Sequence, residues 1–441
     1  MKKAANINEF ANNLIPENFL STEDKNVYVP IYDDLLESLR DMVVNDQVES
    51  QSFFITGQPG TGKTTALNFF PDPIVEAHYS IKYMNMRDFL DLSDVDIIDF
   101  LFAFAFALVQ RTPLEEKYYN RLEEIQRKHD GEIEEIEEKE SVNAYSTGAS
   151  GKVSLSGGFL SYIKLTANFF ANLKLDRTYR QKTREIFKLK KPFLRDLINE
   201  LLDEYNEKII GGKQLLVIID DLDKLKDASQ INSIFIDNRN YIFSLKCKKI
   251  IAIPTYLSKA PEIVNYSSQY PIRQFILRLS QNPFTMSLSN EKDQKIEANR
   301  HLLREVIQCR IADGISLIDD EALEEAIDRS AGIIRQLIRI IYVAAVNVRR
   351  HELKKVSVND VREGIHLLRN QIAGTITSAD KIILLNKILT KNIPDSESAA
   401  GFIELLQANN IVAYENGEPW YEVNPLIKDT VKVYAERQTS K

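Results

Sequence analysis

Short apolar runs alternate with helix-compatible segments over the first two thirds of the chain. The runs lie at 53–55, 215–219, 249–253 and 275–279, and each is bounded by polar or turn residues. Such short, continuously apolar runs are typical of buried parallel strands. Because helical patterns separate them, the order predicts an α/β fold, a parallel sheet with helices on both faces.

From about residue 290 the periodicity becomes helical. Apolar residues recur at three- and four-residue spacing in 291–312, 320–328, 332–350 and 358–371. Asp319 and Ser357 precede two of these segments as N-cap signals. We therefore expect an N-terminal linker and helix over 1–50, an α/β core over 51–289, and a helical lid domain over 290–372.

The last part of the chain combines short helices with a hairpin pattern. Two or three helical patterns in 376–408 precede the apolar alternations 411–414 and 420–423, and Asn416-Gly417 lies between these alternations. Asn-Gly at this place is a strong hairpin signal. Helices followed by a hairpin resemble a winged helix, here over 376–441. This segment has seven basic and nine acidic residues, and 397–409 has no basic residue, which favours packing within the protein or on a partner over DNA reading.

An insertion at about 113–185 interrupts the core. Residues 113–140 hold eleven acidic and five basic residues, which predicts a solvated helical arm. Alternation around 164–175, after a Gly-rich stretch, predicts a long β-hairpin. Residues 152–195 contain eleven Lys or Arg against two acidic residues. This basic segment suits nucleic acid or an acidic partner, but pairing with the acidic arm, in the same or a neighbouring subunit, is favoured because stacking aromatic residues are sparse.

Composition narrows the class of protein. The 441 residues carry a net charge of −8, with 44% hydrophobic and 27% charged residues, which is ordinary for a globular protein of two or three domains. Only Cys247 and Cys309 are present, so neither a disulfide framework nor a cysteine zinc site is indicated. The most apolar stretch, 100–109, is too short to cross a bilayer. We expect a cytoplasmic protein without a membrane segment.

Residues 57–64 read G-Q-P-G-T-G-K-T, directly after the first strand and before a helical pattern. Glycines allow successive backbone N–H groups to surround a phosphate at the start of a helix. In this motif Lys63 reaches the outer phosphates and Thr64 ligates Mg²⁺. The predicted nucleotide-binding residues of this loop are Gly57, Gln58, Pro59, Gly60, Thr61, Gly62, Lys63, Thr64 and Thr65.

A second set of candidate residues follows the strand 215–219. Asp220 is placed to hold Mg²⁺ through water, beside Thr64, and Asp221 to orient or deprotonate the attacking water. Asp223 either caps the next helix or touches the metal shell. Thr255, after the strand 249–253, either bonds the γ-phosphate or the water, or is a turn hydroxyl.

These motifs resemble those of AAA+ or STAND-type P-loop ATPases over about residues 25–370, and within that group the Orc/Cdc6 and KAP branches. The resemblance implies that ATP and Mg²⁺ are the cofactors, that Tyr28 and Ile31 lie beside adenine, and that Thr255 and Arg335 occupy the two sensor positions. From its place one turn into a helix, Arg335 either reaches over the cleft to the nucleotide or is a solvated helix charge. It also implies that Arg273 serves a neighbouring subunit. Asp221 stands where fast AAA+ motors carry glutamate, which favours a slow switch.

The implied function is that of an ATPase acting as a nucleotide-dependent, homo-oligomeric switch. The expected partner is a protein effector, in a bacterial defence system against phage. The alternative is an Orc/Cdc6-like or transposition-type ATPase that assembles on DNA. No nuclease, protease or deaminase motif accompanies the loop.

Overall fold

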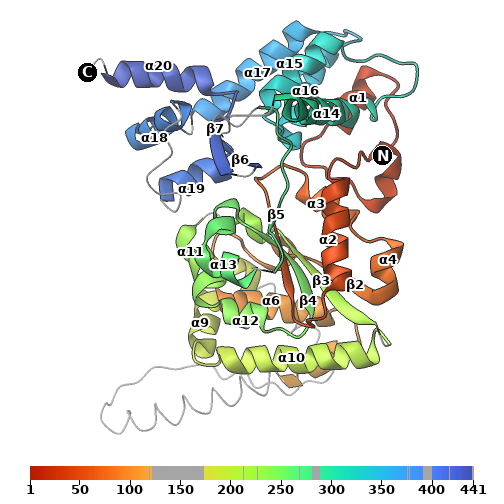
Figure 1. Cartoon of the computed structure of the whole chain (residues 1–441), viewed down its shortest axis with the longest axis vertical. Coiled ribbons are helices and arrows are strands. Elements are labelled where there is room, and N and C mark those ends of the chain that lie inside the picture. Colours follow the sequence, from red (N-terminus) through yellow and green to blue (C-terminus); the bar gives the residue numbers. More distant parts are fainter. Residues whose placement is uncertain are drawn as a thin grey trace, which may run out of the picture.

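The computed structural model describes residues 1–118, 120–121, 173–211, 213–225, 227–267, 269–280, 289–374, 376, 378–390, 400–416 and 418–439. A five-stranded parallel sheet forms its centre (Figure 1), in the order β2-β3-β4-β1-β5. The strands are β1 (Ser52–Thr56), β2 (Tyr79–Asn85), β3 (Gln214–Asp220), β4 (Lys248–Ile253) and β5 (Arg273–Gln274). The α/β class and the first three predicted strands are confirmed.

The strand predicted at 275–279 is wrong. The pairing strand is the two-residue β5, and the backbone N–H of Phe275 adds one more hydrogen bond, to the carbonyl of Thr56 at 2.8 Å. Beyond this bond the chain leaves the sheet, because the backbone of Leu277 packs against Gly332 of the lid. The apolar character of 275–279 therefore reflects burial between two units and not strand pairing.

Helices cover both faces of the sheet, and alternate residues of each strand face opposite layers. On one face, Phe53, Ile55 and Ile250 join a core with α2 (Asp33–Asn45), α3 (Lys63–Asn68) and α4 (Pro73–His78). On the other face, Phe54 and Ile251 join a second core with α6 (Ile97–Val109), α10 (Lys191–Lys208), α11 (Ala228–Asn232), α12 (Arg239–Phe243) and α13 (Pro261–Tyr266). The apolar stretch 100–109 is thus a buried helix on the sheet.

The predicted lid helices are present. They are α14 (Ser289–Gln308), α15 (Asp320–Ser330), α16 (Ile334–Arg350) and α17 (Val358–Ala373), with α1 (Ile7–Asn13) packed on α16. Ser357 caps α17 through a capping box with Asp360. In Figure 1 these helices lie at the carboxyl-end side of the sheet, above the phosphate loop.

The C-terminal unit consists of α18 (Ala379–Leu389), α19 (Ala400–Gln407), β6 (Ile411–Asn416), β7 (Glu418–Val423) and α20 (Lys428–Thr439). β6 and β7 pair antiparallel, with Ile411 opposite Val423. The predicted hairpin is therefore present. Among the described residues, no helix is long and apolar enough to span a membrane.

The insertion is described only at its ends. Most of the predicted acidic arm and β-hairpin lies outside the described residues, but residues 173–175 of the expected hairpin are helical. The following helix, α9 (Arg177–Phe187), carries part of the basic segment. Its Arg180 and Arg184 pair with Asp94, and Arg184 also pairs with buried Asp99. Two of the basic residues thus pair with the core of their own chain.

Candidate functional site

The phosphate loop runs from the end of β1 into α3, and its glycines are required by both conformation and space. Gly57 has a φ of +152° and Gly60 a φ of +91°, in the region that favours glycine. A Cβ on Gly57 would lie 2.6 Å from the carbonyl oxygen of Phe275, and one on Gly60 would lie 2.7 Å from Cβ of Arg335. The loop is therefore enclosed by the segment that follows β5 on one side and by the lid on the other.

Lys63 is directed toward its own loop and a carboxylate. Its Nζ donates to the carbonyl oxygens of Gly57 and Gln58 and lies 2.9 Å from Oδ2 of Asp223. The lysine is 5% exposed and Asp223 is 2% exposed. Burial raises the pKa of Asp223, and the Lys63 charge opposes that rise. In this arrangement the ammonium group that the motif assigns to phosphate is neutralised from inside the protein.

Asp220 and Thr64 are brought together as predicted. Oδ2 of Asp220 accepts a hydrogen bond from the Thr64 hydroxyl at 2.7 Å and from the Tyr83 hydroxyl at 2.6 Å. Burial, followed by the Asp220 charge, raises the pKa of Tyr83, so Tyr83 remains a donor. Sequence reasoning missed Tyr83 because β2 was not predicted. The register that aligns Asn85 with Asp220 positions Tyr83 at this edge.

The acidic cluster fits a hard divalent cation. Ligand atoms of Asp220, Asp221 and Asp223 lie within 4.8 Å of one another. Oδ2 of Asp223 and Oδ1 of Asp221 face the ammonium groups of Lys63 and Lys224, while Oδ1 of Asp223 is buried without a hydrogen-bond donor among the described residues. An all-oxygen set with a neighbouring hydroxyl is the kind that Mg²⁺ prefers. Thr64 and Asp220 could hold the ion, with Asp221 and Asp223 as nearby carboxylates.

Two cations that sequence reasoning did not assign contact Asp221. This residue has a φ of +73°, and its carboxylate pairs with Lys224 and with Arg87, whose Nε lies 3.4 Å away. Burial lowers the pKa of Lys224 to about 8, Asp220 opposes this effect, and the charges of Arg87, Lys63 and Arg335 add to it. In this arrangement the Asp221 carboxylate is held by two cations.

An apolar cavity lies next to the loop, where the base was expected. Tyr28 stacks on Phe69 with ring centroids 3.7 Å apart, and the Tyr32 hydroxyl donates to the carbonyl oxygen of Thr61 at 2.7 Å. The cavity is lined by Asn18, Leu20, Val27, Tyr28, Val29, Ile31, Tyr32, Gly62, Thr65, Ala66, Val306, Arg310, Ile334 and Ile338. Tyr28, Ile31 and Thr65 are therefore brought to one cavity beside Gly62.

The three remaining predicted residues lie at different places. The backbone N–H of Arg335 donates to the carbonyl oxygen of Gly60 at 2.9 Å, so this arginine lies at the loop. Thr255 is half-buried at the carboxyl end of β4, where a short 3-10 helix begins. Arg273 donates to the Ser38 hydroxyl of α2 in its own chain, so it is not gathered into this site.

Asp223 does not cap the next helix. The carboxylate of Asp227 caps α11 by accepting from the backbone N–H groups of Ser229 and Gln230. Asp223 instead faces Lys63, and its place in the metal shell stays a prediction.

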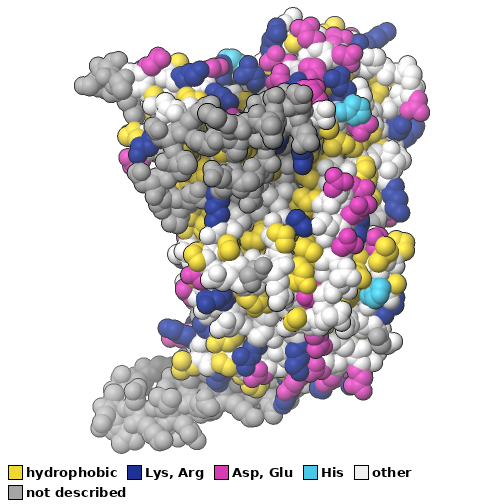
Figure 2. Space-filling model, viewed as in Figure 1, with side chains coloured by type: hydrophobic (Ala, Val, Ile, Leu, Met, Phe, Trp, Pro, Cys, Tyr) yellow, Lys and Arg dark blue, Asp and Glu magenta, His cyan; other side chains and the backbone are white. Residues whose placement is uncertain are grey.

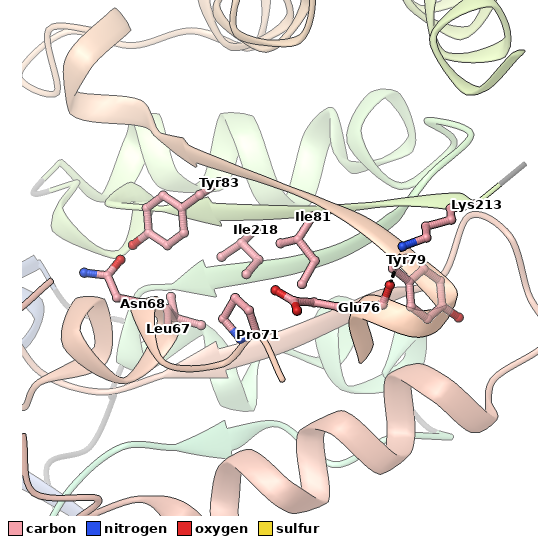
Figure 3. Close-up of a pocket in the computed structure, with 9 residues that line it drawn as sticks. All are labelled: Leu67, Asn68, Pro71, Glu76, Tyr79, Ile81, Tyr83, Lys213 and Ile218. Carbon is pink, nitrogen blue, oxygen red and sulfur yellow. Dashed lines mark hydrogen bonds between the residues drawn. The ribbon is translucent and has the colours of Figure 1, made fainter. Parts of the chain in front are cut away.

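A separate groove of about 470 Å³ runs along β2 (Figure 3). Tyr83 and Asn68 lie at one end, while Lys213, Glu76 and Tyr79 lie at the other. Lys213 Nζ donates to the carbonyl oxygen of Glu76 at 2.8 Å. The groove touches the site only through Tyr83, so it is not the cavity beside the phosphate loop.

The C-terminal unit binds the phosphate loop through Gln58. Its Nε2 donates to the carbonyl oxygens of Ile411 at 2.6 Å and Leu406 at 3.1 Å, and its Oε1 accepts from the backbone N–H of Ala413 at 2.8 Å. Asn409 returns a bond to the carbonyl oxygen of Pro59 at 2.8 Å. We call these contacts the loop–hairpin interface. Gln58 therefore faces the C-terminal unit and not the phosphates.

A glycine-rich loop between β1 and α3, its lysine, and a Thr–Asp pair at the sheet edge define a P-loop NTPase. The chain belongs to the KAP family, because residues 30–351 match the KAP family P-loop domain. The search among curated proteins found no match.

Solved structures match most of the chain at low identity. Cdc6 of Pyrobaculum aerophilum is 11% identical, with a TM-score of 0.42, and the match covers 97% of this chain and 98% of that one. A Walker-type ATPase of Pyrococcus abyssi is 13% identical, with a TM-score of 0.45 and coverages of 95% and 99%. Orc1 of Aeropyrum pernix, solved with DNA, is 13% identical, with a TM-score of 0.41 and coverages of 96% and 98%.

Proposed function

We propose that the protein is a Mg²⁺-dependent ATPase that works as a nucleotide-dependent switch. The observation that carries this proposal is the state of Lys63, which is paired with Asp223 while the C-terminal unit is bound to the same loop through Gln58. A triphosphate must take Lys63 from Asp223 in order to bind. Nucleotide occupancy and the position of the C-terminal unit are then linked.

Amide side chains extend this link to the lid. Nδ2 of Asn424 donates to the backbone carbonyl of Asn409 at 2.7 Å, and the side chains of Asn424 and Gln336 exchange hydrogen bonds at 2.8 and 3.0 Å. Gln336 directly follows Arg335 on α16. The loop, the hairpin and the lid helix are thus joined by one buried polar network, which supports their moving together.

The position of α19 supports a switch over a DNA reader. Phe402, Ile403 and Leu406 of this helix are buried. Gln407 donates to the backbone carbonyl of Asp223 at 3.3 Å. In a winged helix the helix before the hairpin is the one expected to enter the DNA groove, but here it packs toward the ATP site. Over the face shown in Figure 2, basic and acidic side chains are interspersed.

We propose that the same residues carry out ATP hydrolysis. With ATP bound, Lys63 and the loop N–H groups would stabilise charge on the transferred phosphoryl group. Thr64 and Asp220 would hold Mg²⁺, which supplies further charge neutralisation. Asp221, with Thr255 as an alternative, would orient the water after leaving Arg87 and Lys224. This requirement is consistent with slow turnover.

We extend the proposal to a homo-oligomer that controls a protein effector in defence against phage. This part is supported only by the resemblance of the motifs to switch ATPases, with Arg273 proposed to act on a neighbouring subunit. An Orc-like role on DNA is the competing outcome.

Light scattering of the full chain without nucleotide, with ADP, or with a non-hydrolysable ATP analogue tests the switch, each with and without duplex DNA. We expect a defined oligomer with the ATP analogue alone. An oligomer that forms only on DNA would favour the Orc-like role. Lys63→Ala should bind no ATP and remain in the resting mass, whereas Lys213→Ala, an exposed lysine in the β2 groove, should behave as wild type. ATP turnover that persists in Lys63→Ala would refute the site.

A further inference from the structure

Among the described residues that line the cavity beside the phosphate loop, Arg310 is the one with a charged side chain. The other lining groups near it are mostly apolar, among them Val27, Ile31, Val306 and Ile338. Gly62 and Thr65 form the side of the cavity next to the loop. A nucleotide whose phosphates lie in the loop would therefore place its base in this cavity, within reach of Arg310.

The guanidinium of Arg310 is buried and incompletely paired. The residue is 5% exposed, and its Nε has no hydrogen-bond acceptor among the described residues. Its Nη1 donates to the carbonyl oxygen of Val306, in its own helical turn, and lies 3.8 Å from the Cys309 sulfur. The nearby carboxylate of Asp24 acts on the pKa of Arg310 through its charge. Its Oδ2 already accepts a hydrogen bond from the Ser21 backbone N–H at 3.0 Å.

A buried donor without an acceptor is costly. An unsatisfied buried polar group destabilises the folded protein, and a charged group does so more strongly. Burial also lowers the pKa of Arg310, because the charged guanidinium has lost its contact with water. A group that is left in this condition beside a ligand cavity indicates that the acceptor arrives with the ligand.

The chemistry of the side chain limits what that acceptor can be. Arginine only donates hydrogen bonds, so it cannot pair with the amino group of adenine. The acceptors on an adenine ring are its unprotonated ring nitrogens. We propose that Arg310 donates a hydrogen bond to one ring nitrogen of the bound adenine and so determines base specificity. This inference rests on the proposed function, because it assumes that the loop binds ATP.

The experiment is calorimetric titration of the full chain with ATP and its 1-deaza, 3-deaza and 7-deaza analogues. Each analogue replaces one ring nitrogen by C–H and keeps the shape of the base. We expect wild type to bind one of the three about tenfold or more weakly than ATP, as expected for a lost charge-assisted hydrogen bond. Arg310→Met should bind ATP and that analogue equally weakly, and Arg310→Lys should recover part of the difference.

Equal binding of all three analogues and ATP by wild type would overturn the role of Arg310 while leaving the ATPase proposal intact. Unchanged discrimination in a folded Arg310→Met would overturn it as well. If wild type bound no ATP at all, both proposals would fail. The wild-type comparison needs no variant, so a misfolded substitution does not remove the test.

Discussion

Replacing Gln58 by alanine should release the C-terminal unit from the phosphate loop. The change removes the side chain that bonds Leu406, Ile411 and Ala413, and it leaves two carbonyls and one N–H without their partner. If each lost partner costs about 1 kcal/mol after water has entered, docking weakens by about 3 kcal/mol, roughly 100-fold. The loop backbone, Lys63 and Thr64 are left in place, because the Gln58 side chain faces the C-terminal unit.

Hydrogen exchange measures this effect directly. The amide of Ala413 donates to Gln58, so exchange of a peptide that covers β6 should accelerate in Gln58→Ala without nucleotide. The apparent affinity for ATP should rise, because a docked population that resists nucleotide has been removed. Gln51→Ala is the matched control, since Gln51 is also buried but donates to Ser52 at the base of β1. Unchanged β6 exchange together with unchanged ATP affinity would refute the reasoning.

Three further predictions concern stability. Gly332→Ala should lower the free energy of unfolding by at least about 2 kcal/mol, since its Cβ would lie 1.7 Å from the Leu277 carbonyl oxygen at φ +77°. Gly314→Ala, at the same φ with no atom of the described residues within 4 Å, should cost only about 1 kcal/mol. Equal losses measured by urea unfolding would contradict the packing argument. Asn424→Ala and Gln336→Ala should be coupled by about 1 kcal/mol in a double-mutant cycle because their amides pair, whereas additive losses would mean that the pair is not formed. Burial lowers the pKa of Lys249 from 10.5 to about 8. The unfolded chain therefore binds this proton more tightly, and the free energy of unfolding should rise from pH 8 toward 10.5. Lys249→Met should lack that rise, and an identical pH dependence in both proteins would show that the pKa is not lowered.

Much of the fold was predictable because local signals agreed with the global structure. The phosphate loop, the Asp220 strand and the lid helices were each marked by residues close together in sequence. β2 was missed because polar Ser80 and Lys82 interrupt its apolar residues, as an edge strand permits. The run 275–279 was mistaken for a strand because burial between the core and the lid produces the same apolar signal as sheet burial.

The chemistry of the site was predictable in its residue types but not in its resting contacts. That Gln58 binds the hairpin depends on a segment about 350 residues later in the chain, and no local pattern reports such a contact. In the same way, the sheet brings together side chains that follow different strands. This is how Lys63 comes to pair with Asp223, and Asp221 with Arg87. Tyr83 could be found only after β2 was known.

The pairing of Lys63 with Asp223 has a consequence for what the protein can sense. A carboxylate that is part of the chain competes with every incoming anion at a fixed, high effective concentration. Inorganic phosphate would gain the loop N–H groups in exchange, whereas a triphosphate would also gain a cation and the cavity beside the loop. The site is therefore expected to respond to the whole nucleotide and to ignore free phosphate, so that resting protein stays inactive in a cell rich in small anions.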